Sequence, residues 1–452
     1  MTIPPADTPS PETRLAVAEP PKPLDGFAPE EFQARRKALR AACPDGLILI
    51  RGTTEDEVSA SAATYRQNSA FFYLTGVDTP GAYLVLLPES VPANAGMRDL
   101  APDLREILFL PARNPSGETW TGPKLGPGEE TEKLTGIPKV AEAGGLWNAL
   151  TGWLRRNPLL YTLTPYGERA KLTREYALMQ KIADVAPAVQ FRDCSLALGQ
   201  QRVVKSPTEL ERIRQAIAIT AEGQRAARAF IAAGAGKWEY EAEARVFEAF
   251  RSRGATLAFA SIVGAGQRGT VLHYEHNQEQ MQDGELVVVD IGARWGHYCG
   301  DLTRTYPVGG VFSSRQREIY SLVREAHERA VAGYRPGEDT LKSLSDRCKE
   351  FLKNSPLRAK DADGAEQTMD VFMPHSLSHY LGLDVHDVGD PLPPIPPGSV
   401  ITVEPGIYIP SEGIGVRIED DYLVTPAGLE RLGPPLETDP DAIEAAMRRT
   451  EL

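Results

Sequence analysis

The stretch ITVEPGIYIPSEGIGVRIEDD, residues 401–421, predicts two β-strands joined by a short turn of proline, serine and glycine. Each strand carries one carboxylate in an apolar setting, Glu404 in the first and Glu419 in the second. Burying a carboxylate without a cation or a hydrogen-bond donor is costly, and two neighbouring carboxylates repel each other. A positive charge is therefore expected between them. It could be a metal ion or Arg417, which strand alternation places on the face of Glu419; a purely structural buried ion pair fits this stretch equally well.

The composition of the 452-residue chain is that of a soluble globular protein with two or three domains. It is 42% hydrophobic and 25% charged, and no run of residues is long and apolar enough to span a membrane. The formal net charge of -13 and the lack of a basic stripe argue against nucleic acid as a partner. The four cysteines show no CxxC spacing, so we expect reduced thiols and a cytoplasmic location.

The first part of the chain is expected to form a lead-in and a small domain. Residues 1–28 are rich in proline, lack the apolar core of a signal peptide and predict an extended or disordered segment. Residues 29–200 predict a small α/β domain, with helices near 29–43 and 146–154 and strands at 46–50, 71–77, 82–88, 106–111 and 159–163. The polar segment 65–69 is either a capped loop or an element that faces a substrate or partner.

Residues 201–452 predict a larger α+β domain. Its first helix is expected to begin at Ser206, because Ser206, Pro207 and Glu209 match the N-cap, N1 and N3 positions of a capping box. Each half of the domain then has the pattern of two helices followed by antiparallel strands. In the first half, a helix at 238–250 precedes strands at 256–263, 272–274, 285–292 and 297–306; in the second, helices at 315–332 and 340–353 precede strands near 400–408 and 415–424. Two similar lobes around one shared cleft are therefore expected.

A second pair of carboxylates lies in the first half of this domain. Asp290 ends the apolar run at 287–289, and Asp301 lies in the strand that returns. A hairpin with its turn at 294–296 would bring the two side by side. An aspartate at the end of a buried strand is often only a cap, but its pairing with a second aspartate favours a functional site.

Three of the seven histidines, His375, His379 and His386, lie in one segment, 372–388. The first two are four residues apart, so a helical turn would place both on one face. Ser376 follows His375 where an HExxH zinc-protease helix needs glutamate, and that motif is excluded. A lone histidine is more often a core or surface group than a ligand, but three beside a glycine-bearing turn favour a site.

Together these residues have the ligand balance for two divalent cations such as Mn²⁺, Co²⁺ or Zn²⁺. The set is Asp290, Asp301, His379, Glu404 and Glu419. Two such ions roughly 3.5–4 Å apart share bridging carboxylates and a bridging water, whose lowered pKa yields hydroxide near neutral pH. The ions would also neutralise carboxylates that otherwise repel one another.

The same residues lie in runs that resemble the metal-binding motifs of the pita-bread metallopeptidases, a family that includes methionine aminopeptidase, prolidase and aminopeptidase P. The runs, in order, are VVVDIGA, YCGDLTRTYPV, HSLSHYLGLDVHDVG, TVEPGIY and VRIEDD. LHY at His273 and VHDVG at His386 resemble the proline-selective branch, and YRQNSAFFYLTGVDTPGAYLVLLP at 65–88 resembles the amino domain of the aminopeptidase P group. Ser376 departs from the family, where glycine is usual. The resemblance implies a C-terminal pita-bread domain of two pseudo-symmetric lobes.

By this resemblance, the site would hold two divalent metal ions, with Mn²⁺ expected first and Co²⁺ or Zn²⁺ as alternatives. Asp290 would bind one ion and His379 the other, while Asp301 and Glu419 would bridge them. Glu404 would bind a metal and act as the proton shuttle.

The resemblance also implies residues that contact the peptide. His386 and His273 would lie beside the scissile carbonyl and the proline pocket, as both catalytic and substrate-binding candidates. His375, Tyr408 and Arg417 are further substrate-binding candidates, although Tyr408 and Arg417 fit a structural role equally well.

The activity that the resemblance implies is removal of the first residue from peptides with proline in second position, by attack of a metal-bridging hydroxide, in a homo-oligomer such as a dimer or tetramer. Prolidase, which cuts only Xaa-Pro dipeptides, has the same ligands and stays open. Methionine aminopeptidase fits less well because of the large amino domain, and a non-catalytic peptide-binding module fits less well because all five ligands are present.

The run GAGQRG at 264–269 matches the GxGxxG motif of dinucleotide-binding sites. A strand-like run follows it where such a site needs a helix, so a dinucleotide site is excluded.

Overall fold

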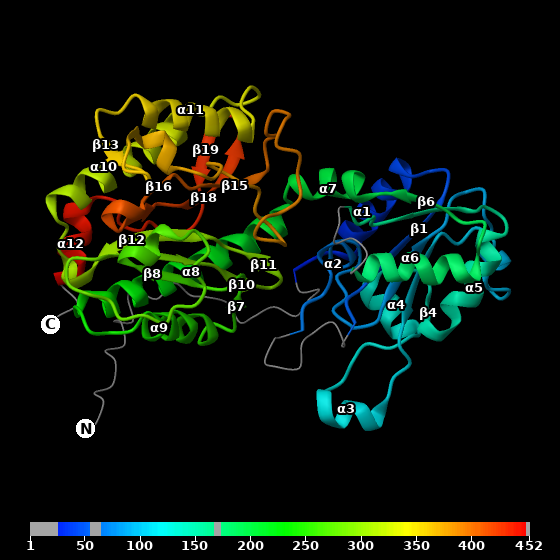
Figure 1. Ribbon diagram of the computed structural model, residues 1–452. Helices are drawn as coiled ribbons and strands as arrows, with labels where there is room; N and C mark the ends of the chain where they lie inside the picture. The colour runs from blue at the N-terminus through cyan, green and yellow to red at the C-terminus, as the bar shows by residue number, and fades with distance from the viewer. Residues whose placement is uncertain (1–25, 55–64, 167–172, 449–452) are drawn as a thin grey trace. The chain divides into compact units, whose positions relative to one another are not determined.

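The computed structural model describes residues 26–54, 65–166 and 173–448 of the chain. Contacts among these residues divide it between Arg202 and Val203 into two compact units, which we call the N-terminal unit and the C-terminal unit (Figure 1). Most of the expected lead-in at 1–28 lies outside the described residues.

The N-terminal unit is built on one mixed six-stranded sheet with the order β4-β3-β2-β1-β5-β6. The central pairs β1–β2 and β2–β3 are antiparallel, and the outer pairs are parallel. The strands are β1 (Leu47–Arg51), β2 (Tyr83–Leu86), β3 (Glu106–Leu110), β4 (Val140–Glu142), β5 (Leu159–Thr162) and β6 (Gln190–Asp193). The helices are α1 (Pro29–Ala42), α2 (Ser69–Thr75), α3 (Pro115–Thr121), α4 (Glu129–Thr135), α5 (Leu146–Leu154), α6 (Arg174–Val185) and α7 (Ser195–Val203). The predicted α/β class is confirmed.

The aromatic run at 71–77, predicted as a strand, instead lies mostly in helix α2. The Asn68 side chain caps this helix by accepting a hydrogen bond from the Phe71 N–H at 3.0 Å, and Gly76 ends it in the left-handed region with φ 64°. Every residue at 70–75 is buried, so the run has neither helical nor strand periodicity. Its aromatic side chains favoured the strand prediction, and the local cap decides for the helix.

The polar segment 65–69 is a capped loop, one of the two alternatives that its sequence left open. The buried Gln67 side chain accepts a hydrogen bond from the Thr53 N–H at 2.7 Å. Its Nε2 donates to the carbonyls of Val77 at 3.2 Å and Thr79 at 3.1 Å. These bonds fix the chain on both sides of α2.

The C-terminal unit begins with helix α8 (Pro207–Ala232), and the predicted capping box at Ser206 and Glu209 is present. The first half continues with α9 (Glu239–Arg251) and with strands β7 (Thr256–Leu257), β8 (Ile262–Ala265), β9 (Leu286–Ile291), β10 (Ala293–Trp295), β11 (Tyr298–Cys299) and β12 (Leu302–Pro307). β8, β9 and β12 form one antiparallel sheet, and β7, β10 and β11 form another.

Two strand predictions in this half need correction. The run at 256–263 contains β7 and only the start of β8, with irregular backbone between them, and the run at 272–274 is a turn that follows the short 3-10 helix η6 (Gly266–Thr270). The Asn277 side chain supplies a reason for the interruption of the first run, because its Oδ1 accepts from the Val263 N–H at 2.9 Å and its Nδ2 donates to the Ser261 carbonyl at 2.9 Å. Side-chain bonds thus replace a strand partner here. The GAGQRG run at 264–269 ends β8 and forms most of η6, and the turn at 272–273 follows where a dinucleotide site needs an α-helix.

The second half repeats the outline of the first. Its elements are α10 (Ser314–Ala332), α11 (Leu341–Lys353), β13 (Arg358–Lys360), β14 (Glu366–Thr368), β15 (Val400–Val403), β16 (Gly406–Ile409), β17 (Ile414–Arg417), β18 (Asp420–Thr425), β19 (Gly428–Arg431) and α12 (Pro440–Arg448). The strands of the two halves lie between α8 and α9 on one side and α10 and α11 on the other (Figure 1). The predicted α+β class is confirmed.

An antiparallel bridge between Thr303 and Glu419 joins the strands of the two halves. The Glu419 N–H donates to the Thr303 carbonyl at 3.0 Å. The buried Arg304 guanidinium holds this bridge, because it donates to the carbonyls of Thr303 at 2.8 Å and Glu419 at 2.7 Å. It also donates to the buried Asp420 carboxylate at 2.7 Å, so its own charge is paired.

The buried side chains of the C-terminal unit form one core that draws on both halves, with Ile219 and Val289 from the first and Val323 and Ile401 from the second. A shared core means that the two halves support each other's strands. Within the described ranges, no helix combines the length and the apolar composition needed to cross a membrane.

The close approach of Gly300 to helix α8 can be tested by substitution. A Cβ at Gly300 would lie 2.7 Å from the Ile217 nitrogen and 2.8 Å from its Cα. Because helix backbone cannot move aside cheaply, we expect Gly300→Ala to lower the free energy of unfolding by about 2 kcal/mol, measured by urea titration. Gly144→Ala, where the added methyl would meet no heavy atom within 4 Å, is the control and should be close to neutral. Equal urea midpoints for the two variants would contradict this close packing.

Candidate metal centre

Two breaks in the strands at 401–421 place the carboxylates of Glu404 and Glu419. The sequence predicts two strands here, but each is divided: Glu404 lies between β15 and β16, and Glu419 lies between β17 and β18. β15 pairs with β18 and β16 pairs with β17, so the two breaks lie opposite each other. The Thr303 hydroxyl donates to Glu419 Oε2 at 2.7 Å and orients that carboxylate.

The aspartate pair in the first half comes together as expected, with a small correction to the turn. Asp290 on β9 lies opposite Thr303 on β12, and Asp301 directly precedes β12. The tight turn lies at Gly296 and His297, which have positive φ of 55° and 74°, and not at 294–296. This pair of left-handed residues matches the two-residue turn between β10 and β11.

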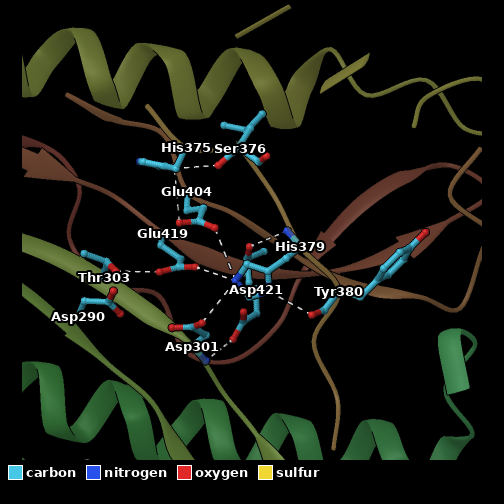
Figure 2. A network of polar contacts seen from close by, with 12 residues as sticks. Asp290, Asp301, Thr303, His375, Ser376, His379, Tyr380, Glu404, Glu419 and Asp421 are labelled. Atoms are coloured by element: carbon cyan, nitrogen blue, oxygen red, sulfur yellow. Dashed lines mark hydrogen bonds and ion pairs between the residues drawn. The ribbon is translucent and has the colours of Figure 1, made fainter. Parts of the chain in front are cut away.

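His379 lies at the centre of these carboxylates (Figure 2). Its Nε2 is 3.5 Å from Glu404 Oε1, 3.6 Å from Asp301 Oδ2 and 3.9 Å from Glu419 Oε1. Its other ring nitrogen, Nδ1, is 3.0 Å from the Tyr380 carbonyl, which orients the ring. The segment that carries it is irregular and contains no helical turn, so the predicted shared helix face of the two histidines is wrong. Long-range contacts, and not a local helix, bring His379 to the site.

The five predicted metal ligands therefore converge. One ligand atom each from Asp301, His379 and Glu419 lies within 4.8 Å of the others. Glu404 joins them through its contact with His379, and Asp290 is close enough that its charge raises the pKa of Glu419.

Burial and mutual repulsion raise the pKa values of three of these carboxyl groups. The pKa of Asp301 and that of Glu404 lie well above their usual range, first because of burial and then because of Glu419. Burial and then Asp290 raise the pKa of Glu419 to about 8. Burial lowers the pKa of His379 to about 4, so its imidazole is neutral near pH 7 and its contacts with the carboxylates are not ion pairs. The site thus concentrates acidic groups around a neutral ring nitrogen.

Four buried carboxylate oxygens in this region have no hydrogen-bond donor within the described part of the chain: Asp290 Oδ1, Asp301 Oδ1, Glu419 Oε1 and Asp421 Oδ1. Buried polar atoms are normally paired, so such a group needs an explanation. Divalent cations prefer carboxylate oxygen and imidazole nitrogen, and they would satisfy these atoms and balance their charge. The donor set therefore fits metal ions.

Arg417 belongs to a hydrogen-bonded chain behind the carboxylates. Its guanidinium donates to Asp290 Oδ2 at 2.5 Å and to the Tyr408 hydroxyl at 2.7 Å. The same hydroxyl is 3.0 Å from His375 Nε2, and His375 Nδ1 is 2.8 Å from the Ser376 carbonyl. Arg417 thus pairs with Asp290 and not, as the strand alternation suggested, mainly with the carboxylate of Glu419.

His386 and His273 lie on the exposed side of the site. The His386 ring is 4.2 Å from the His379 ring, centroid to centroid. The pKa of His386 is lowered first by burial and then by the charge of His273. His273 itself is exposed, on the turn that follows η6.

Two residues that support the site were not predicted from the sequence. Thr303 orients Glu419, and Asp421 Oδ2 accepts a hydrogen bond from the Asp301 N–H at 2.9 Å. Strand alternation places Asp421 on the face of Glu419 and could have indicated it. The same alternation places Thr303 on the face of Asp301 in the predicted strand at 297–306, but only the pairing of distant strands gives it its role.

The raised pKa of Glu419 predicts how the stability of the metal-free protein depends on pH. Between its usual value of 4.5 and its folded value of about 8, the folded protein holds a proton that the unfolded chain releases, so stability falls as pH rises. Histidines with pKa near 4, such as His379, act in the opposite direction, but only below about pH 6.5. We therefore expect the melting temperature in EDTA to fall between about pH 6.5 and 8.

Glu419→Gln is the matched variant for this measurement, since it removes the titrating group and keeps an acceptor for Thr303. Its melting temperature should fall less steeply over the same window. Excess Mn²⁺ should raise the wild-type melting temperature most at the upper end, where the carboxylates ionise more readily. A wild-type melting temperature that is flat or rising in EDTA would contradict the raised pKa.

Comparison with known proteins identifies the family. Residues 211–426 match the model of metallopeptidase family M24, and residues 32–161 match that of the aminopeptidase P N-terminal domain. The chain is 35% identical to the Xaa-Pro aminopeptidase of Escherichia coli (strain K12), over 92% of this chain and 97% of that protein. It is 30% identical to the mitochondrial intermediate cleaving peptidase 55 of Arabidopsis thaliana, over 90% and 80% respectively. The structure of aminopeptidase P from E. coli with the inhibitor Pro-Leu superposes with a TM-score of 0.78 at 32% identity, over 94% of this chain and 99% of that one. The expected pita-bread fold is confirmed, and the chain belongs to metallopeptidase family M24, in its aminopeptidase P group.

Proposed function

We propose that this chain is a metal-dependent aminopeptidase that removes the N-terminal residue from peptides with proline in second position. The observation that carries the proposal is the buried cluster of carboxylates around His379, with several carboxylate oxygens that no donor among the described residues satisfies. The E. coli relatives named Xaa-Pro aminopeptidase and aminopeptidase P support the choice of substrate. The imide bond before proline lacks an N–H, so a dedicated pocket for the ring is needed.

The proposed site holds two divalent ions, with Mn²⁺ as the first choice and Co²⁺ or Zn²⁺ as alternatives. Asp290 and His379 would be the terminal ligands of the two ions, Asp301 and Glu419 the bridges, and Glu404 a further ligand. Bound ions would supply a Lewis acid for the scissile carbonyl and a water of lowered pKa. Arg417 and Thr303 support this arrangement by holding Asp290 and Glu419 in place.

Glu404 is the proposed proton shuttle. Its side chain is 18% exposed, against 2% for Glu419, so it is the glutamate that substrate and water can reach. Burial and then Glu419 raise its pKa, which is the direction that favours uptake of a proton. A general acid–base group is most effective when its pKa lies near the working pH.

His386 and His273 are proposed to orient the peptide at the scissile carbonyl and the proline ring. Their position on the exposed side of His379 supports this role. His375 and Tyr408 lie one step further along the chain of hydrogen bonds that ends at Arg417 and Asp290. They are proposed to line the substrate site and to hold Arg417.

We also propose that residues 29–200 and 201–452 are separate domains and that the enzyme is a cytoplasmic homo-oligomer. The division of contacts at Arg202 and the two family matches support the domain boundary. The four cysteines are buried thiols, which suits a reducing compartment. Because one relative is named as mitochondrial, the compartment does not follow from family membership.

Loss of one bridging carboxylate tests the proposed metal chemistry. Asp301→Ala should lower hydrolysis of Arg-Pro-Pro by on the order of a hundredfold or more, because metal-site geometry is sensitive to every partner. The purified wild type should carry two ions per chain after Mn²⁺ loading, measured by elemental analysis, and the variant fewer. Asp346→Ala, an exposed aspartate on α11 that pairs with Lys342, is the control and should behave as wild type. Full metal-dependent activity of Asp301→Ala would show that the mechanism is wrong.

Peptide length separates the proposed activity from prolidase. We expect a higher kcat/KM for Arg-Pro-Pro than for the dipeptide Arg-Pro, since an aminopeptidase accepts chain beyond the proline. Arg-Ala-Pro, with proline one place later, is the control and should be cut poorly. A strong preference for the dipeptide would instead identify a prolidase, and a lack of cleavage in all three, with bound metal, would favour a peptide-binding module.

A further inference from the structure

The loop between β8 and β9 carries His273 but has little regular structure of its own. After η6, residues 271–279 form turns and irregular backbone without a strand partner. A loop of this kind is mobile unless side chains or packing fix its backbone. What holds it therefore matters for any role of His273.

The carboxylate of Glu239, at the start of α9, reaches both ends of this loop. Its Oε1 accepts from the Ala265 N–H and from Arg268 Nε, both at 2.9 Å. Its Oε2 accepts from the Tyr274 hydroxyl at 2.9 Å and from the Glu279 N–H at 3.0 Å. The side chain is fully buried, and these four bonds satisfy both oxygens.

Glu239 is itself held in place. Its N–H donates to the Glu279 carbonyl at 3.0 Å, so the two residues are bonded to each other in both directions. The neighbouring Trp238 forms an antiparallel bridge with Gln280. Arg268 supplies the opposite charge that makes a buried carboxylate tolerable. The carboxylate is thus a fixed point against which the loop is positioned.

Tyr274 is the link from this fixed point to the site. It is the residue next to His273, and its hydroxyl also lies 3.4 Å from the Gln278 N–H. His273 is proposed to act on the peptide beside His386, whose ring lies 4.2 Å from that of His379, centroid to centroid. Glu239 is therefore connected to His273 through the hydroxyl of Tyr274, the next residue along the chain.

We propose that Glu239 is the positioning residue for His273 and that it acts through the hydroxyl of Tyr274. The proposal rests on the proposed function, in which His273 orients the peptide. A glutamate suits the task because four donors converge on it. Glutamine offers one acceptor oxygen, and its NH₂ group would face donors, so Glu239→Gln should loosen both ends of the loop.

The competing explanation is that Asn277 alone fixes the loop. Its buried side chain bonds to Val263 and Ser261, as described above. Those bonds anchor the loop at a point three residues beyond Tyr274 and do not include the tyrosine hydroxyl. The two explanations therefore differ in what loss of that hydroxyl does.

A double-mutant cycle on Arg-Pro-Pro hydrolysis tests the proposal. Tyr274→Phe removes one hydrogen bond and keeps the ring, and it should lower kcat/KM about fivefold. In a His273→Ala background the same change should have an effect within about twofold, because its route to the substrate is gone. Tyr240→Phe, a half-exposed tyrosine one residue from Glu239, is the matched control and should be unchanged. Equal effects of Tyr274→Phe in both backgrounds, or no effect in either, would overturn the proposal.

A second readout does not depend on the substrate. In protein labelled with ¹³C-histidine, the His273 signal is assigned by its loss in His273→Ala. Tyr274→Phe and Glu239→Gln should shift or broaden this signal and leave that of the buried His327 unchanged. An unchanged His273 signal in both variants would overturn the proposal. If the wild type does not cut the peptide, the proposed function is wrong, and the NMR comparison alone decides the role of Glu239.

Discussion

Repulsion among buried carboxylates is the constraint on which the C-terminal unit depends. Asp301, Glu404 and Glu419 have raised pKa values because they are buried beside one another. The fold holds them there through the bridge between Thr303 and Glu419, which the buried Arg304 guanidinium clamps. Each half brings carboxylates to that bridge, so neither half could build the site alone. The proposed divalent ions would complete a charge balance that the protein leaves unfinished.

Four of the five proposed metal ligands lie where regular strands stop, and the fifth, Asp290, lies inside β9. Glu404 and Glu419 occupy breaks between strands, Asp301 precedes a strand, and His379 precedes the bridge from Tyr380. A continuous ladder would alternate side chains between two faces of a sheet. At a break, the backbone changes direction, and side chains from different strands can aim at one point. The sheets hold the site rigid, and the breaks allow its side chains to point toward one another.

The sequence-based errors have a common cause. The run at 71–77 was expected as a strand and is mostly the helix α2, and the run at 272–274 was expected as a strand and is a turn. In the first run, the Asn68 side chain satisfies a backbone N–H of the new helix, and the Asn277 side chain does the same for backbone groups of the interrupted run at 256–263. Short apolar runs do not carry enough periodicity to reveal such local bonds. Long elements with caps, such as the helix that begins after Ser206, were predicted well.

The sequence by itself indicated the fold class and the candidate metal ligands, because capping patterns, strand runs and the short motifs around Asp290, Asp301, His379 and Glu419 are each local features. It could not determine which groups support them. Only the tertiary structure pairs Arg417 with Asp290, bonds Thr303 to Glu419 and joins Glu239 to the loop of His273. These contacts connect residues that are distant along the chain. They depend on how strands from the two halves pair, and no local sequence pattern specifies that pairing.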